Sequence, residues 1–77
     1  MALICITCKD NKEAKKISRH LLEKRLIACS NTFPVESMYW WEGKITEDKE
    51  VAIIAKTLGK NFKKIKEEVK KIHSYKI

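Results

Sequence analysis

Cysteine is the residue type in this chain whose spacing most directly points to chemistry. Cys5 and Cys8 form a Cys-x-x-Cys pair, a spacing found in zinc sites and in thiol redox centres. Their segment reads as a β-strand, in which residues three apart point to opposite faces, and the sequence has no second pair to complete a four-ligand zinc site. We therefore expect both thiols to be small, buried, apolar groups.

The two histidines give little support for catalysis. No nucleophile, base and orienting group can be assembled from Cys29, His20 and His73, and no pair of carboxylates lies in an apolar setting. The sequence therefore predicts a protein that is not an enzyme. His73 follows the last apolar position of a predicted helix, where the helix dipole favours a charged imidazole. It is either a solvated helix-ending residue or part of a binding site.

Tyr39, Trp40 and Trp41 are consecutive aromatic residues in a predicted strand. Alternation sends Trp40 to one face of the strand and Tyr39 with Trp41 to the other. The predicted helices supply one covering layer. The other face must meet a partner chain or a ligand, because a large exposed apolar patch is unusual on a soluble monomer. This leaves two interpretations. Either Trp40 and Trp41 pack in a subunit interface, or the aromatic rings border a pocket for a small molecule or an ion.

Composition and length indicate one small domain spanning residues 1–77. A chain of this size buries little apolar surface by itself, which favours assembly with a partner chain. No stretch approaches the roughly 20 apolar residues of a membrane span. An odd number of cysteines in predicted strands favours free thiols in a reducing compartment, so we expect a cytoplasmic protein. The net charge of +7 is concentrated between Lys60 and Lys76, where there are seven lysines and two glutamates.

Apolar residues at positions 2–7 predict a short strand that is central in its sheet and covered on both faces. Asp10 followed by Glu13 resembles a capping box and predicts a helix over residues 11–24. The first strand and the first helix are therefore separated by a short connection that also caps the helix.

Two long strands follow, over residues 26–41 and 45–57, joined by a hairpin turn in which Gly43 supplies a positive φ. Pro34 marks a bend or an edge strand, where its missing N–H costs no ladder hydrogen bond. A second helix begins after Gly59. Its predicted apolar stripe consists of Phe62, Ile65, Val69 and Ile72.

The order strand, helix, strand, strand, helix makes up most of the split βαβ, or ferredoxin-like, unit. We therefore predict an α+β sandwich with an antiparallel sheet and two helices on one face. Residues 73–77 read as the entry to a fourth strand, and we expect this strand to be truncated or missing. Without it, the first strand keeps an open edge that invites pairing with another chain.

Several blocks of residues resemble the divalent-cation tolerance (CutA) family. The first is an apolar run with a cysteine and an asparagine, made up of Leu26, Ile27, Ala28, Cys29, Ser30 and Asn31. The second matches a Tyr-x-Trp-x-Gly-x-Ile motif and then an acidic pair, with Tyr39, Trp41, Gly43, Ile45, Asp48 and Glu50. Further matches are Lys56 and Thr57 after the third strand, and a His-Pro-Tyr motif at His73 and Tyr75 in which Ser74 replaces the proline.

This resemblance implies a homotrimer of ferredoxin-like subunits and a non-enzymatic role in tolerance of divalent cations, copper among them. It makes Cys29 the thiol to consider for copper, with His73 as a second ligand, because soft thiolate and imidazole ligands suit this metal. Packing alone is the alternative for Cys29. The resemblance also implies a cleft between neighbouring subunits, bordered by Tyr39, Trp41, Glu50, Lys56, His73 and Tyr75. Lys76 replaces a glutamate of the family pattern there.

Two other functions are compatible with the same fold. A signalling trimer could bind a small anionic metabolite through Lys56 and its neighbours, although the sequence has no glycine-rich phosphate loop. A basic ferredoxin-like domain also describes an RNA-recognition motif, which needs stacking aromatic residues in its first and third strands. Residues 2–7 and 51–57 contain none. We therefore expect no nucleic acid partner.

Overall fold

The computed structural model describes residues 1–72 as one antiparallel sheet with two helices. The elements are β1 (Ala2–Cys8), α1 (Asn11–Glu23), β2 (Cys29–Trp41), β3 (Lys44–Thr57), the 3-10 turn η1 (Gly59–Asn61) and α2 (Phe62–Ile72). The strand order in the sheet is β1-β3-β2. This arrangement confirms the predicted α+β, ferredoxin-like fold. The predicted entry to a fourth strand at residues 73–77 lies outside the described residues.

Helix α1 begins where the sequence predicts. Asp10 Oδ1 accepts a hydrogen bond of 2.8 Å from the Glu13 backbone N–H, and Glu13 Oε1 accepts one of 3.1 Å from the Lys9 backbone N–H. These bonds satisfy backbone amides around the helix start that have no partner within the helix. The helix ends at Glu23, one residue before the predicted end, and Arg25 follows in the left-handed conformation with a φ of 56°.

The hydrophobic core lies between the two helices and one face of the sheet. Its buried apolar side chains are Ile6 and Cys8 of β1, Val51, Ile53 and Ala55 of β3, Ala14, Ile17 and Leu21 of α1, Ile27, and Ile65 and Val69 of α2. Alternate residues of β1 and β3 thus point toward the helices, as the two-residue period of a strand requires. The prediction of two helices on one face of the sheet is confirmed.

Strand β1 differs from the prediction. The sequence predicts a central strand that is covered on both faces, but β1 lies at an edge of the described sheet and only one of its faces is covered. Leu3 is 68% exposed and Cys5 is also exposed, whereas Ile6 and Cys8 are buried. Both helices pack on the side of the sheet to which Ile6 points. The prediction failed because an apolar composition alone does not determine how many faces of a strand are covered.

Strand β2 begins at Cys29, three residues later than predicted. The Leu26 N–H donates a hydrogen bond of 3.0 Å to the Leu21 carbonyl, which closes the end of α1. The Ala28 N–H donates one of 2.8 Å to the Lys56 carbonyl of β3. The segment before Cys29 is therefore a hydrogen-bonded connection between α1 and the sheet, and not part of the strand.

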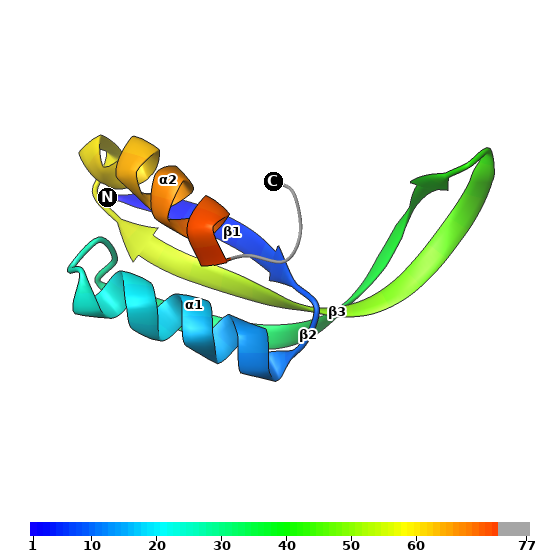
Figure 1. Ribbon diagram of the computed structural model, residues 1–77, viewed down its shortest axis with the longest axis horizontal. Helices are drawn as coiled ribbons and strands as arrows, with labels where there is room; N and C mark the ends of the chain where they lie inside the picture. Colours follow the sequence, from blue (N-terminus) through cyan, green and yellow to red (C-terminus); the bar gives the residue numbers. More distant parts are fainter. Residues whose placement is uncertain (73–77) are drawn as a thin grey trace.

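Strands β2 and β3 continue past the helices as a two-stranded arm, residues 36–49 (Figure 1). The turn at its tip contains Glu42 and Gly43, which have positive φ angles of 50° and 77°, and this confirms the predicted turn. Pro34 belongs to β2 and is paired with Val51 of β3. As predicted for this proline, β2 is an edge strand of the described sheet. The arm makes the molecule elongated, with principal extents of 39, 22 and 21 Å.

Helix α2 buries two of the four residues of its predicted apolar stripe, and a third, Ile72, is partly buried against the core. Ile65 and Val69 are buried in the core. Phe62 is 53% exposed, which corrects its assignment to the buried stripe. It is the first residue of α2 and lines an apolar hollow beside β1, together with Ile4 and Ile65. Its ring therefore lies at the margin of the core.

Candidate functional site

The strand register places five of the predicted site residues on one face of the sheet. Residues that are directly paired in antiparallel strands point to the same face, and Cys29 is paired with Lys56. Glu50 and Lys56 alternate along β3 with the buried core residues, so they point away from the helices. Tyr39 and Trp41 share the face of Cys29 by the same alternation along β2. We call this face, which lies opposite α1 and α2, the open face.

The site residues of the open face are spread along the whole hairpin. Cys29 and Lys56 are paired near the core, and Trp41 is paired with Lys44 at the tip of the arm. The stretch of β3 from Lys44 to Lys56 corresponds to about 40 Å of extended chain. One chain therefore does not gather Cys29, Lys56 and Trp41 into a single cleft.

The aromatic residues of the arm are exposed on both of its faces. Trp41, on the open face, is 63% exposed, and Trp40, on the opposite face, is 72% exposed. The prediction that the helices cover one of these faces is wrong, because the arm extends beyond both helices (Figure 1). Tyr39 is held in place across the arm, where its hydroxyl donates a hydrogen bond to the Asp48 carboxylate.

The three cysteines are free thiols that differ in exposure. Cys8 is fully buried, and this burial, together with the nearby Glu13 carboxylate, raises its pKa to about 11. It is therefore a neutral and unreactive thiol at physiological pH. Cys5 is exposed on the open face, which corrects the prediction that it is buried. Cys5 and Cys8 point to opposite faces as predicted, so they do not share a metal ion.

Within residues 1–72, no three His, Cys, Asp or Glu side chains lie close enough together to hold a metal ion. Cys29 is half-buried, and the residue paired with it is the positively charged Lys56. A single thiolate beside a positive charge is not a ligand set for copper, so the described part of one chain does not by itself fit this metal. His73 and Tyr75, the other predicted site residues, lie outside the described residues. None of the described helices has the length and apolar character needed to cross a membrane.

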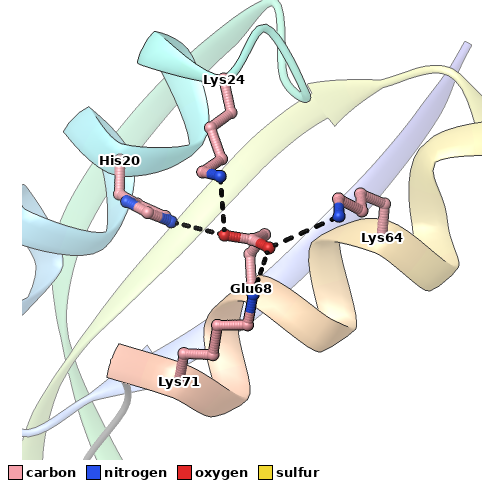
Figure 2. Close-up of polar contacts among 5 residues, drawn as sticks. All are labelled: His20, Lys24, Lys64, Glu68 and Lys71. Atoms are coloured by element: carbon pink, nitrogen blue, oxygen red, sulfur yellow. Dashed lines mark hydrogen bonds and ion pairs between the residues drawn. The ribbon is translucent and has the colours of Figure 1, made fainter.

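A cluster that is not predicted from the sequence joins the two helices. Figure 2 shows Glu68, whose side chain is 2% exposed, among the side chains of His20 and three lysines. Its Oε1 lies 2.9 Å from His20 Nε2 and 3.3 Å from Lys24 Nζ. Its Oε2 lies 3.0 Å from Lys71 Nζ and 3.7 Å from Lys64 Nζ. The hydrogen bond from His20, followed by that from Lys71, lowers the pKa of Glu68 to about 2.

Part of this cluster has a signal in the sequence. Lys64 and Lys71 stand four residues before and three residues after Glu68, a spacing that places all three on one side of a helix. Glu68 also directly precedes the buried Val69. His20 has no such signal, because it belongs to another helix and reaches Glu68 only in the folded chain.

Comparison with known proteins decides the family. The family of CutA1 divalent ion tolerance proteins matches residues 2–77. The chain belongs to the CutA1 family. A curated CutA1 relative, the divalent-cation tolerance protein CutA of Archaeoglobus fulgidus, is 49% identical to it over 72 residues, which are 94% of this chain and 71% of the relative.

Solved CutA1 structures have the same fold. A variant of CutA1 from Pyrococcus horikoshii OT3 superposes with a TM-score of 0.94 at 43% identity, covering 100% of this chain and 76% of that one. The Archaeoglobus fulgidus structure, described as the periplasmic divalent cation tolerance protein CutA, gives a TM-score of 0.92 at 48% identity. It covers 95% of this chain and 72% of that one. The fold of the described residues thus agrees with the family that the sequence blocks resemble.

Proposed function

We propose that this chain forms a non-enzymatic homotrimer that acts in divalent-cation tolerance and binds copper or another divalent cation between its subunits. Membership of the CutA1 family supports the tolerance role. The observation that carries the proposal is the arm, whose large apolar side chains are exposed on both faces. These are Met38 (65% exposed), Trp40 (72%), Trp41 (63%) and Ile45 (65%).

Partner chains provide the cover that these side chains lack. Exposed apolar patches on both faces of an arm are unusual for a soluble monomer, and an isolated two-stranded hairpin is marginally stable in water. Packing of Trp40 and Trp41 in subunit interfaces covers the exposed apolar patches and stabilises the two-stranded arm. The number of three chains follows from the family resemblance. In this assembly the cleft between neighbouring subunits is bordered by Tyr39, Trp41, Glu50, Lys56, His73 and Tyr75.

The proposed cation site takes ligands from more than one chain. Cys29 is half-buried on the open face and offers a soft thiolate, a ligand type that suits copper. Residues 1–72 of one chain complete no group of three ligands, and we propose His73 as the second ligand. Cation binding then depends on assembly, because residues 1–72 of a single chain supply too few ligands and the residue paired with Cys29 in the sheet is a lysine.

Light scattering at micromolar protein concentration tests the assembly. We expect the mass of three chains and essentially no folded monomer, because each arm needs a neighbouring chain to cover its tryptophans. A well-folded monomer under these conditions would contradict the interface role of Trp40 and Trp41.

Calorimetric titration with copper tests the thiol ligand. Cys29→Ser should weaken copper binding by about tenfold or more. Cys5→Ser is the matched control, because Cys5 is a free thiol on the same open face, and it should leave the affinity unchanged. Equal copper affinity in the wild type and both variants would leave Cys29 with a packing role only.

We also propose a cytoplasmic location, which the three free thiols support. The Archaeoglobus fulgidus relative is described as periplasmic, so the two locations need to be distinguished. Cell fractionation with an antibody against the protein should recover it with cytoplasmic markers. Recovery with periplasmic markers would contradict this location.

A further inference from the structure

The contact between α1 and α2 gathers positive charge around one buried carboxylate. We call this group the helix seam; it consists of His20, Lys24, Lys64, Glu68 and Lys71 (Figure 2). Three ammonium groups surround one carboxylate, so two positive charges are not balanced within the seam even when His20 is neutral. The surrounding layer is also basic. Residues 11–25 contain six Lys or Arg and two Glu, and residues 59–72 contain six Lys and two Glu.

Each lysine of the helix seam keeps hydrogen-bond donors for a further acceptor. An ammonium group has three N–H donors, and each of these lysines is directed toward one oxygen of Glu68. The side chains of Lys24, Lys64 and Lys71 are 46%, 55% and 65% exposed. Glu68 itself, at 2% exposed, lies beneath them. A ligand that approaches from solvent therefore meets the ammonium groups and not the carboxylate.

Glu68 also holds these cations near one another before any ligand arrives. Ammonium groups that converge without a carboxylate repel each other. Here Lys64 and Lys71 contact the same oxygen, Oε2, and Lys24 contacts the other. This arrangement lowers the ordering cost of binding an anion, because the contacting side chains are already positioned.

We propose that the helix seam binds the phosphate chain of an oligophosphate, with Lys24, Lys64 and Lys71 as its cationic contacts. Phosphoryl groups present several negatively charged acceptor oxygens, and lysine binds phosphate as a point charge. Linked phosphoryl groups spread their charge over several atoms and so can contact lysines from both helices. The helix seam lies on the side of the sheet away from the open face, so this inference is independent of the proposed cation site.

Isothermal titration calorimetry with inorganic tripolyphosphate tests the proposal, at about 0.15 M salt so that general charge attraction is screened. Lys24→Gln/Lys71→Gln removes two contacts of the helix seam. Lys15→Gln/Lys63→Gln removes the same charge from exposed positions of the same two helices. We expect an affinity loss of about tenfold or more for the seam variant and of less than about twofold for the control. Equal losses, or no saturable binding by the wild type, would overturn the proposal.

A single substitution keeps the test decisive if the double variant does not fold. Lys64→Gln removes the longest of the three lysine contacts to Glu68, 3.7 Å. The affinity of this variant for tripolyphosphate should still fall. A folded Lys64→Gln variant with wild-type affinity would overturn the proposal. A parallel titration with ATP separates two sources of the phosphate chain. Equal affinities indicate that a free phosphate chain is sufficient, and tighter binding of ATP indicates a nucleotide.

Discussion

His20 Nε2 lies 2.9 Å from Oε1 of Glu68, a residue 48 positions later in the chain. This hydrogen bond joins α1 to α2, and it is the largest cause of the low pKa of Glu68, about 2 against an ordinary value of 4.5. A carboxyl group whose pKa is lower in the folded state than in the unfolded chain favours folding when it is ionised. The two helices are therefore held together by a charge that acid removes.

We expect acid to weaken the folded state through Glu68. Its contribution is fully present above the unfolded pKa of about 4.5 and is lost as the pH falls from there to about 2. Glu68→Gln should therefore lower the free energy of unfolding at neutral pH and flatten its dependence on pH between these two values. Urea unfolding at a series of pH values measures both effects.

Glu67→Gln is the matched control for this prediction, because Glu67 is an exposed residue of the same helix. It should leave the free energy of unfolding at neutral pH close to that of the wild type. The assignment to Glu68 would be wrong if Glu68→Gln kept the pH dependence of the wild type.

Replacing both Trp40 and Trp41 by serine should dissociate the proposed trimer. Full burial of a tryptophan removes about 150 to 250 Å² from water, which stabilises an interface by about 4 to 6 kcal/mol. Dissociation should therefore begin at a protein concentration more than about a hundredfold higher than for the wild type. Sedimentation velocity measures this. Leu58→Ser, at a 49% exposed position outside the arm, should keep the wild-type mass; dissociation of this control would argue against a specific role of the arm.

Removal of the helix cap at Asp10 should destabilise α1. Asp10→Ala loses the bond from the Glu13 N–H to Asp10 Oδ1 and should lower the free energy of unfolding by about 1 kcal/mol. Asp10→Asn keeps an acceptor oxygen at the cap and should retain most of the stability. Denaturant unfolding of the three proteins tests this, and equal losses for Ala and Asn would show that the side-chain acceptor is not what stabilises the helix start.

Thr57→Val should weaken the connection between α1 and β2. The Thr57 hydroxyl, in a residue that is 2% exposed, donates a hydrogen bond of 2.6 Å to the Leu26 carbonyl. Its removal leaves that carbonyl with the longer 3.3 Å bond from Asn61 Nδ2, and we expect a loss of about 1 to 3 kcal/mol in unfolding free energy. Thr57→Ser keeps the hydroxyl and serves as the control. A Val variant as stable as the Ser variant would contradict this role.

The sequence by itself determines the features of this protein that have local causes. Asp10 and Glu13 predict the start of α1 because an N-cap acts over only three residues. The turn at Gly43 is predicted because few other residues adopt a positive φ without strain. The opposite directions of Cys5 and Cys8 follow from the two-residue period of a strand. The blocks around Cys29 and Trp41 indicate the family and, through it, the fold.

Only the tertiary structure decides the features that depend on which segments meet. Strand β1 has one covered face because both helices pack on the same side of the sheet, so Cys5 is exposed although its neighbours are apolar. Glu68 has helical neighbours that the sequence reveals, but its bond to His20 depends on how α1 crosses α2. The register pairs Cys29 with Lys56 and keeps them about 40 Å of strand away from the tip of the arm. Contacts between distant segments have no period in the sequence, so no local pattern reports them.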